Sequence, residues 1–161
     1  MKVIFLDVDG VLNCIGWLKQ NDGKPYDKNS IDPSRVELLK EIIDKTGAKI
    51  VLSSTWRNVC GADGDPPLMM YEYLVKSLKK CGIEIYSHTP LINNDRPREI
   101  RAWLDRNADT DIKFVSLDDD FGERAYGEQG IADRLIRTMY WDINGGLQQE
   151  HVEKAIKLLN E

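Results

Sequence analysis

The chain has 161 residues, 42% of them hydrophobic and 30% charged, which suits one domain with a sizeable core and is too apolar for disorder. Its formal net charge of −5 argues against binding of nucleic acid by an extended positive surface, so any phosphate must be bound by a local group of residues. No apolar run approaches the roughly 20 residues of a membrane span, and the three cysteines, in no CxxC arrangement, predict neither a disulfide framework nor a zinc site. We therefore expect a reduced, cytoplasmic protein that forms a single domain over residues 1–161, with no membrane partner.

Short apolar runs alternate along the chain with segments of helical periodicity. The first run, residues 2–6, is continuous, as expected for a strand covered on both faces. Later strands are expected at residues 48–52, 83–86, 112–117 and 134–140. The clearest helix covers residues 33–46, with Asp32 as N-cap, Pro33 in the first turn and Gly47 as the stop. Further helices are expected from near residue 66 to before Gly82, within residues 94–104 and over 147–159, with a loop at 61–65.

This alternation predicts an α/β fold in which helices cover both faces of a mainly parallel, five-stranded sheet in three Rossmann-like layers. In such sheets the chemistry gathers beyond the carboxyl ends of the strands. Polar residues follow three of the predicted strands directly: Asp7 after the first, residues 53–57 after the second and residues 118–120 after the run that begins at 112. We expect these segments to lie together at one edge of the sheet.

Asp7 and Asp9 are two residues apart, so in an extended stretch they share a face, where both are costly to bury unless paired or bound to a cation. A simple turn at Asp9 and Gly10 is one alternative. A calcium loop of the EF-hand type is excluded, because aligning its glycine with Gly10 puts Phe5 and Gly16 at ligand positions.

Three further carboxylates, Asp118, Asp119 and Asp120, would join Asp7 if the sheet brings their strands together. Such a cluster predicts a hard cation bound by oxygen, and Mg²⁺ held by few carboxylates, waters and a phosphate is the natural choice. Which of these three acids binds the metal directly stays open.

The chain resembles the haloacid dehalogenase (HAD) superfamily of phosphatases, whose four motifs occur here in order and span nearly the whole sequence. They are Asp7-Val8-Asp9-Gly10 after the first strand, Ser53 or Ser54 after the second, a basic residue within 96–100, and Asp118-Asp119. The stretches "VLSSTWR", "RPREIRAWL" and "GGLQQEHVEKAIKLL" further resemble the HAD domains of Swiss-army-knife RNA repair proteins. One departure is Val11, which stands where the family usually carries threonine.

The resemblance implies a phosphatase in which Asp7 attacks phosphorus to form a phosphoaspartate. Asp9 then protonates the leaving oxygen and activates the hydrolytic water. Mg²⁺ is implied at Asp7, Asp118 and Asp119, together with the backbone carbonyl of Asp9.

The resemblance also implies residues that hold the phosphoryl group. Ser53 is favoured over Ser54 because it directly follows its strand, as Asp7 does. Arg96 is favoured over Arg98, because a phosphate at the first turn of its helix would offset the unfavourable helix dipole. Gly10 lets the chain turn away and approach the substrate.

Two neighbouring residues, Trp56 and Arg57, are candidates for substrate binding. Arg57 is expected to contact a substrate phosphate, whereas Trp56 suits either stacking on a base or packing in the core. Residues 14–31 allow only a short flap in place of a cap domain, with a hairpin turning at 21–24.

An open site suits a large phosphoester, so a nucleotide or nucleic-acid end is the expected substrate of this predicted magnesium-dependent phosphatase. Dephosphorylation of a phosphoprotein, or a non-enzymatic phosphate-binding or receiver-like module, is the alternative. The sequence does not indicate an oligomeric state.

Overall fold

The computed structural model describes residues 1–24, 27–59 and 69–161, and in these ranges the chain forms an α/β fold around one parallel sheet. Five strands run in the order β3-β2-β1-β4-β5, and every neighbouring pair is parallel. Their bounds are Lys2–Leu6 for β1, Lys49–Leu52 for β2, Ile85–His88 for β3, Lys113–Asp118 for β4 and Leu135–Arg137 for β5. The five predicted strands are therefore confirmed, with ends that differ by a few residues.

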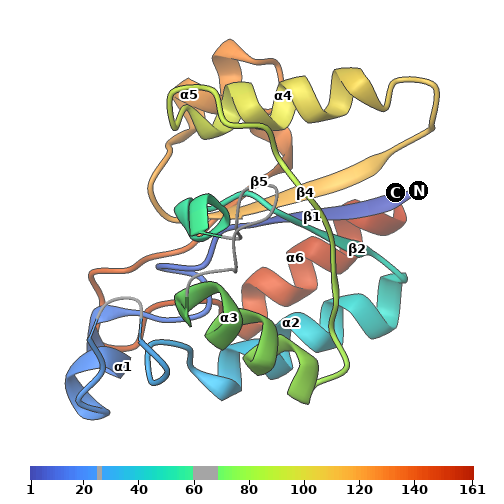
Figure 1. The fold of residues 1–161 in the computed structure, drawn as a ribbon. Helices are drawn as coiled ribbons and strands as arrows, with labels where there is room; N and C mark the ends of the chain where they lie inside the picture. The colour runs from blue at the N-terminus through green and yellow to red at the C-terminus, as the bar shows by residue number, and fades with distance from the viewer. Residues whose placement is uncertain (25–26, 60–68) are drawn as a thin grey trace.

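Helices cover both faces of the sheet and complete three layers (Figure 1). On one face lie α2 (Pro33–Thr46), α3 (Met69–Lys80) and α6 (Gln149–Asn160), and on the other α4 (Arg96–Arg106) and α5 (Glu123–Glu128). Residues 61–65, where a loop was expected, and the predicted start of the second long helix lie outside the described residues.

The central strand β1 is buried on both sides, as its continuous apolar run predicts. Ile4 and Leu6 belong to the core beneath α2 and α6, whereas Val3 and Phe5 pack in a second core with the α4 residues Ile100, Trp103 and Leu104. Alternate residues of one strand therefore serve the two faces, as the period of two in a strand requires.

The signals at the ends of α2 act as predicted. The Asp32 carboxylate accepts a hydrogen bond of 2.9 Å from the backbone N–H of Ser34. Gly47 ends the helix in the left-handed conformation, with φ of 69°.

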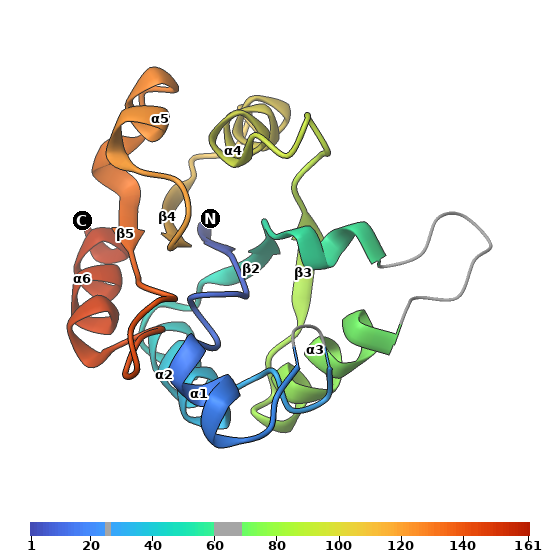
Figure 2. The same ribbon diagram turned by 90° about the vertical axis from the view of Figure 1, so that its left-hand side faces the viewer.

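The segment between β1 and α2 contains the short helix α1 (Ile15–Gln20) where a hairpin was expected, so that prediction is wrong. The indole of Trp17 donates a hydrogen bond of 2.9 Å to the Asn29 carbonyl, and Leu18 is buried, so local contacts replace strand pairing. Figure 2 looks onto the edge where the strands end and shows α1 on this side of the molecule. Among the described residues, no helix has the length and apolarity needed to span a membrane.

Candidate active site

The ends of three neighbouring strands bring the predicted motifs together. Asp7 follows β1, Ser53 follows β2 and Asp118 is the last residue of β4. The backbone N–H of Asp7 donates to the Leu117 carbonyl at 3.1 Å, and that of Ser53 donates to the Leu6 carbonyl at 2.8 Å. These bonds continue the sheet by one residue and fix the backbone from which the polar side chains start.

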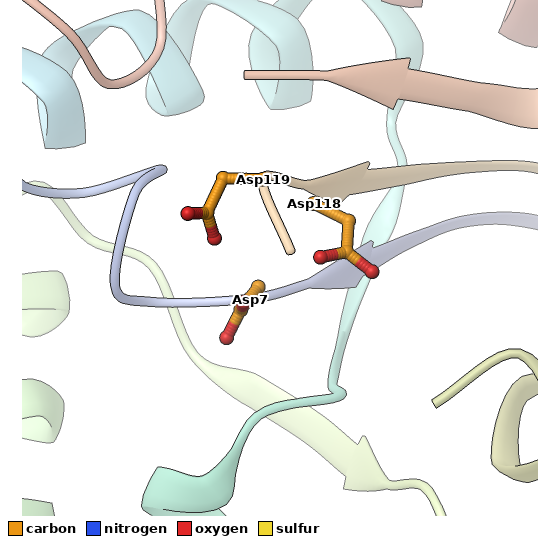
Figure 3. Close-up of side chains that lie close together, drawn as sticks. All are labelled: Asp7, Asp118 and Asp119. Carbon is orange, nitrogen blue, oxygen red and sulfur yellow. The ribbon is translucent and has the colours of Figure 1, made fainter. Parts of the chain in front are cut away.

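Asp7, Asp118 and Asp119 form a cluster in which one carboxylate oxygen of each lies within 4.8 Å of the others (Figure 3). Asp118 is fully buried, and its position is held by the hydroxyl of Tyr126, which donates to Oδ2 at 2.7 Å, and by the backbone N–H of Asp120, which donates to Oδ1 at 3.0 Å. Asp120 itself is exposed. The structure therefore brings the first and last motifs into one small volume.

Arg96 bridges this cluster from the first residue of α4. Its Nη1 lies 2.7 Å from Asp7 Oδ2 and also forms an ion pair with Asp118. Although burial alone would lower it, the pKa of Arg96 is raised above its ordinary value by these two carboxylates. Arg98, in contrast, is exposed, so the structure places Arg96 against the acids.

The carboxylates are held in an environment that opposes their charge. Burial raises the pKa of Asp7 to about 7, with the charge of Asp118 adding to the effect and Arg96 opposing it. Burial and the charge of Asp118 likewise raise the pKa of Asp119 to about 6. The three side chains offer only carboxylate oxygens, and the raised pKa values indicate that their negative charges are unfavourable without a counterion. Both features fit a divalent hard cation such as Mg²⁺.

Gly10 is required by the position of Asp119. Its φ is 77°, and a Cβ atom on residue 10 would lie 2.1 Å from Asp119 Cγ. The backbone N–H of Gly10 also donates to Asn13 Oδ1 at 2.9 Å, which closes the turn after β1. The glycine of the first motif thus makes room for an acid of the fourth.

Asp9 lies beside the cluster with both carboxylate oxygens engaged. Asn13 Nδ2 donates to Oδ1 at 2.9 Å, and Trp56 Nε1 donates to Oδ2 at 2.9 Å. Trp56 is fully buried in the core beneath α2, which agrees with the packing alternative rather than with stacking on a base. The expected contact of the Asp9 backbone carbonyl with a metal stays a prediction.

The two serines after β2 point to different neighbours. The Ser54 side chain hydrogen-bonds with Asp7, whereas the Ser53 hydroxyl accepts a bond of 3.4 Å from Thr89 Oγ1. Both are fully buried. The structure therefore brings Ser54, not the favoured Ser53, against the predicted nucleophile.

Arg57 does not offer its guanidinium to the site. It is buried in an ion pair with Glu99 of α4, and its Nη1 donates to the Ser54 carbonyl at 2.8 Å. Glu99 in turn accepts a bond of 2.8 Å from the backbone N–H of Ile92. This arrangement differs from the expected phosphate contact, because Nη1 and Nη2 of Arg57 bind the protein itself.

An open pocket of about 520 Å³ leads to the acids. Asp7, Asp9, Arg96 and Asp119 line it, together with Asp120, Thr55, Tyr140 and Trp141. The sequence reasoning missed the two aromatic residues, and it also missed the supporting roles of Asn13 and Tyr126. Asn13 lies three residues after the glycine, where a turn-closing amide is common, but Tyr126 carries no comparable signal in sequence.

A comparison with known protein families identifies the family that this chain resembles. The family model described as the HAD domain in Swiss Army Knife RNA repair proteins matches residues 3–152, which include β1 from its second residue, the other four strands and every side chain of the cluster. A comparison with curated proteins gives no match. The predicted resemblance is confirmed, and the chain belongs to the family of HAD domains found in Swiss Army Knife RNA repair proteins.

Proposed function

We propose that the protein is a magnesium-dependent phosphatase that hydrolyses a phosphomonoester, on a nucleotide or the end of a polynucleotide, through a phosphoaspartate at Asp7. The observation that carries this proposal is the convergence of Asp7, Asp118 and Asp119 around Arg96 beneath an open pocket. The family match to RNA repair proteins supports the choice of a nucleic-acid end.

Asp7 is suited to attack because its carboxylate is held in one orientation. The backbone N–H of Val8 donates to Oδ1 at 2.8 Å, and Arg96 pairs with Oδ2. In the first step an oxygen of Asp7 bonds to phosphorus, and the bond from phosphorus to the ester oxygen breaks. Arg96 and Ser54 are the groups placed to bind the oxygens of the phosphoryl group.

Asp9 is the proposed acid and base, because it lines the same pocket beside Asp7. It gives its proton to the leaving oxygen in the first step. In the second step it takes a proton from the water that attacks phosphorus, which releases inorganic phosphate and restores the Asp7 carboxylate. Trp56 and Asn13 hold its two oxygens and so orient it for both transfers.

Asp7, Asp118 and Asp119 would hold the Mg²⁺ ion. When bound, the ion supplies positive charge that reduces the repulsion between the Asp7 carboxylate and the anionic phosphoester. The cluster suits this role because burial already raises the pKa values of Asp7 and Asp119, so a cation would relieve unfavourable charge.

A panel of phosphorylated substrates, assayed with Mg²⁺ and again with a chelator, tests the proposal. It should include RNA oligomers phosphorylated at either end, nucleotides, sugar phosphates and phosphopeptides. We expect release of phosphate from the oligomers, and none from the Asp7→Asn variant. Borohydride reduction of acid-quenched enzyme should convert residue 7 to homoserine.

The exposed acid provides a matched control, since Asp120→Asn changes a carboxylate outside the cluster. Undiminished turnover by Asp7→Asn would overturn the proposed mechanism. Preferential release of phosphate from phosphopeptides would instead move the proposal to a phosphoprotein substrate.

A further inference from the structure

The loop between β5 and α6 carries an unusual share of exposed apolar side chains. Of the large hydrophobic residues that the described chain exposes, Met139, Trp141 and Ile143 lie within five positions, and Trp141 is the most exposed at 77%. Tyr140 and Trp141 also line the pocket that contains Asp7. An indole that is both exposed and part of the proposed active site is well placed to contact substrate.

Backbone contacts hold this loop firmly against the start of α1. The N–H of Gly146 donates to the Met139 carbonyl at 2.9 Å, which closes the loop on itself, and the N–H of Ile15 donates to the Tyr140 carbonyl at 2.9 Å. Gly16 packs so tightly that a Cβ atom there would lie 1.8 Å from the Ile143 carbonyl oxygen. The indole is therefore carried by a backbone with little freedom to move.

The rings of Tyr140 and Trp141 pack edge to face, with centroids 4.9 Å apart and planes at 87°. This arrangement is favourable for two aromatic rings and restrains the indole from one side. Since Trp141 is 77% exposed, most of the indole surface stays open to solvent. We call this pair of residues, Tyr140 and Trp141, the aromatic platform.

We propose that the aromatic platform stacks against the nucleobase that bears the phosphorylated sugar, so that the substrate is recognised by its base as well as by its phosphate. This inference rests on the proposed phosphatase function, and it names the nucleobase as a second part of the substrate that the protein recognises. Stacking on an indole is tolerant of base identity, because every base has an aromatic face.

The charges of the residues that line the pocket favour contact with a neutral base of the substrate over contact with additional phosphates. Among the described residues that line it, Arg96 is the one cation, and Asp7, Asp9, Asp119 and Asp120 are all acidic. Arg96 is already engaged by two carboxylates. Additional phosphates would meet repulsion there, whereas a neutral, flat base would meet an exposed ring.

The test compares RNA trinucleotides phosphorylated at one end with the same oligomers whose terminal nucleotide lacks its base. For the wild type we expect kcat/KM to be about tenfold higher with the base present, mainly through KM. Trp141→Ala should bring this ratio close to one, and Trp141→Phe should retain most of it. Ile143→Ala is the matched control, because Ile143 is a similarly exposed residue of the same loop that does not line the pocket.

Binding supplies a readout that does not depend on turnover. Adenosine 5′-monophosphate titrated into the Asp7→Asn variant should quench tryptophan fluorescence, and adding Trp141→Phe should remove the saturable part of that quench. An unchanged quench, or an unchanged preference for the base in Trp141→Ala, would overturn the platform while leaving phosphate release intact.

Failure of the proposed function would look different. In that case no oligomer would lose phosphate with Mg²⁺, while the fluorescence titration would still decide whether the aromatic platform binds a base. If Trp141→Ala instead abolished a preference for phosphotyrosine over phosphoserine peptides without affecting the oligomers, the platform would be a peptide site and the nucleobase assignment would be wrong.

Discussion

Trp56 Nε1 donates a hydrogen bond of 2.9 Å to Asp9 Oδ2, which joins two segments that are 47 positions apart in the sequence. The indole is fully buried, and its one polar atom reaches the edge of the proposed active site. A core residue thus determines the orientation of the carboxylate to which we assign proton transfer.

Replacing Trp56 with phenylalanine should keep an aromatic ring in the core and remove this hydrogen bond. We expect kcat to fall about ten- to a hundredfold with little change in KM, because a hydrogen bond to a charged group contributes about 1.5–3 kcal/mol. Steady-state kinetics over a range of pH would measure the effect. Trp103→Phe is the matched control, since the Trp103 indole donates to Ser87 in the opposite core; equal losses in the two variants would contradict the role of Trp56.

Metal binding should stabilise the protein more at pH 8 than at pH 5.5. The folded pKa values of Asp7 and Asp119, about 7 and about 6, lie above the ordinary value of 3.8. The folded protein therefore holds protons that the unfolded chain releases, and its metal-free stability should fall as pH rises from about 4 to about 7. Mg²⁺ competes with these protons, and at a hundred times its Kd it would add about 2.7 kcal/mol.

Thermal unfolding with Mg²⁺ or with a chelator at the two pH values measures this difference. Asp119→Asn should weaken the shift caused by Mg²⁺, whereas Asp120→Asn should change it much less, because Asp120 lies outside the cluster. A Mg²⁺ shift that is equal at both pH values would argue against these carboxylates as the metal ligands.

Ser54→Ala should lower kcat/KM more than Ser53→Ala. The Ser54 side chain hydrogen-bonds with Asp7, so its loss removes a contact to the proposed nucleophile and the proposed donor to the phosphoryl group. We expect a loss of about tenfold or more, in line with one hydrogen bond to a charged group. Kinetics on one phosphorylated oligomer would rank the two variants, and a larger loss in Ser53→Ala would restore the choice made from sequence.

Arg57→Leu should destabilise the fold, because it leaves the Glu99 carboxylate buried without its partner. Breaking a buried pair from one side costs about 3–5 kcal/mol, and the double variant with Glu99→Gln should recover part of that loss. Urea unfolding measures the stability, and KM is determined under conditions where the variant is folded. A large rise in KM without a change in stability would instead favour direct contact between Arg57 and substrate.

Local signals predicted the elements of this fold well, because the core of an α/β sheet requires continuous apolar strands and helices with clear ends. Asp32 and Gly47 bound α2 as expected, and Asp7 and Asp118 meet at the predicted edge. Sequence alone could not decide between Ser53 and Ser54, because the two residues are adjacent and only the fold determines which side chain meets Asp7.

The partners of Arg57 and Trp56 could likewise not be predicted from the sequence. Arg57 is paired with a residue of α4, and Trp56 with the loop after β1, so each partner is set by how separate elements pack rather than by local pattern. The hairpin expected at residues 21–24 failed for a related reason. Leu18 and Trp17 find partners within the segment and favour a helix.

The close approach of Gly10 and Asp119 has a consequence for how this site can change. A Cβ atom at residue 10 would overlap the carboxyl group of Asp119, so a side chain at position 10 is compatible with the fold only if the side chain at position 119 moves or is replaced. The constraint runs in one direction: residue 119, a proposed metal ligand, can be replaced while residue 10 stays glycine, whereas a side chain at residue 10 also requires a change at residue 119. A library that randomises residue 10 alone should return almost only glycine. Because φ of residue 10 is 77°, a library that randomises both positions should add mainly Asn or Asp at position 10, each paired with a smaller residue at position 119.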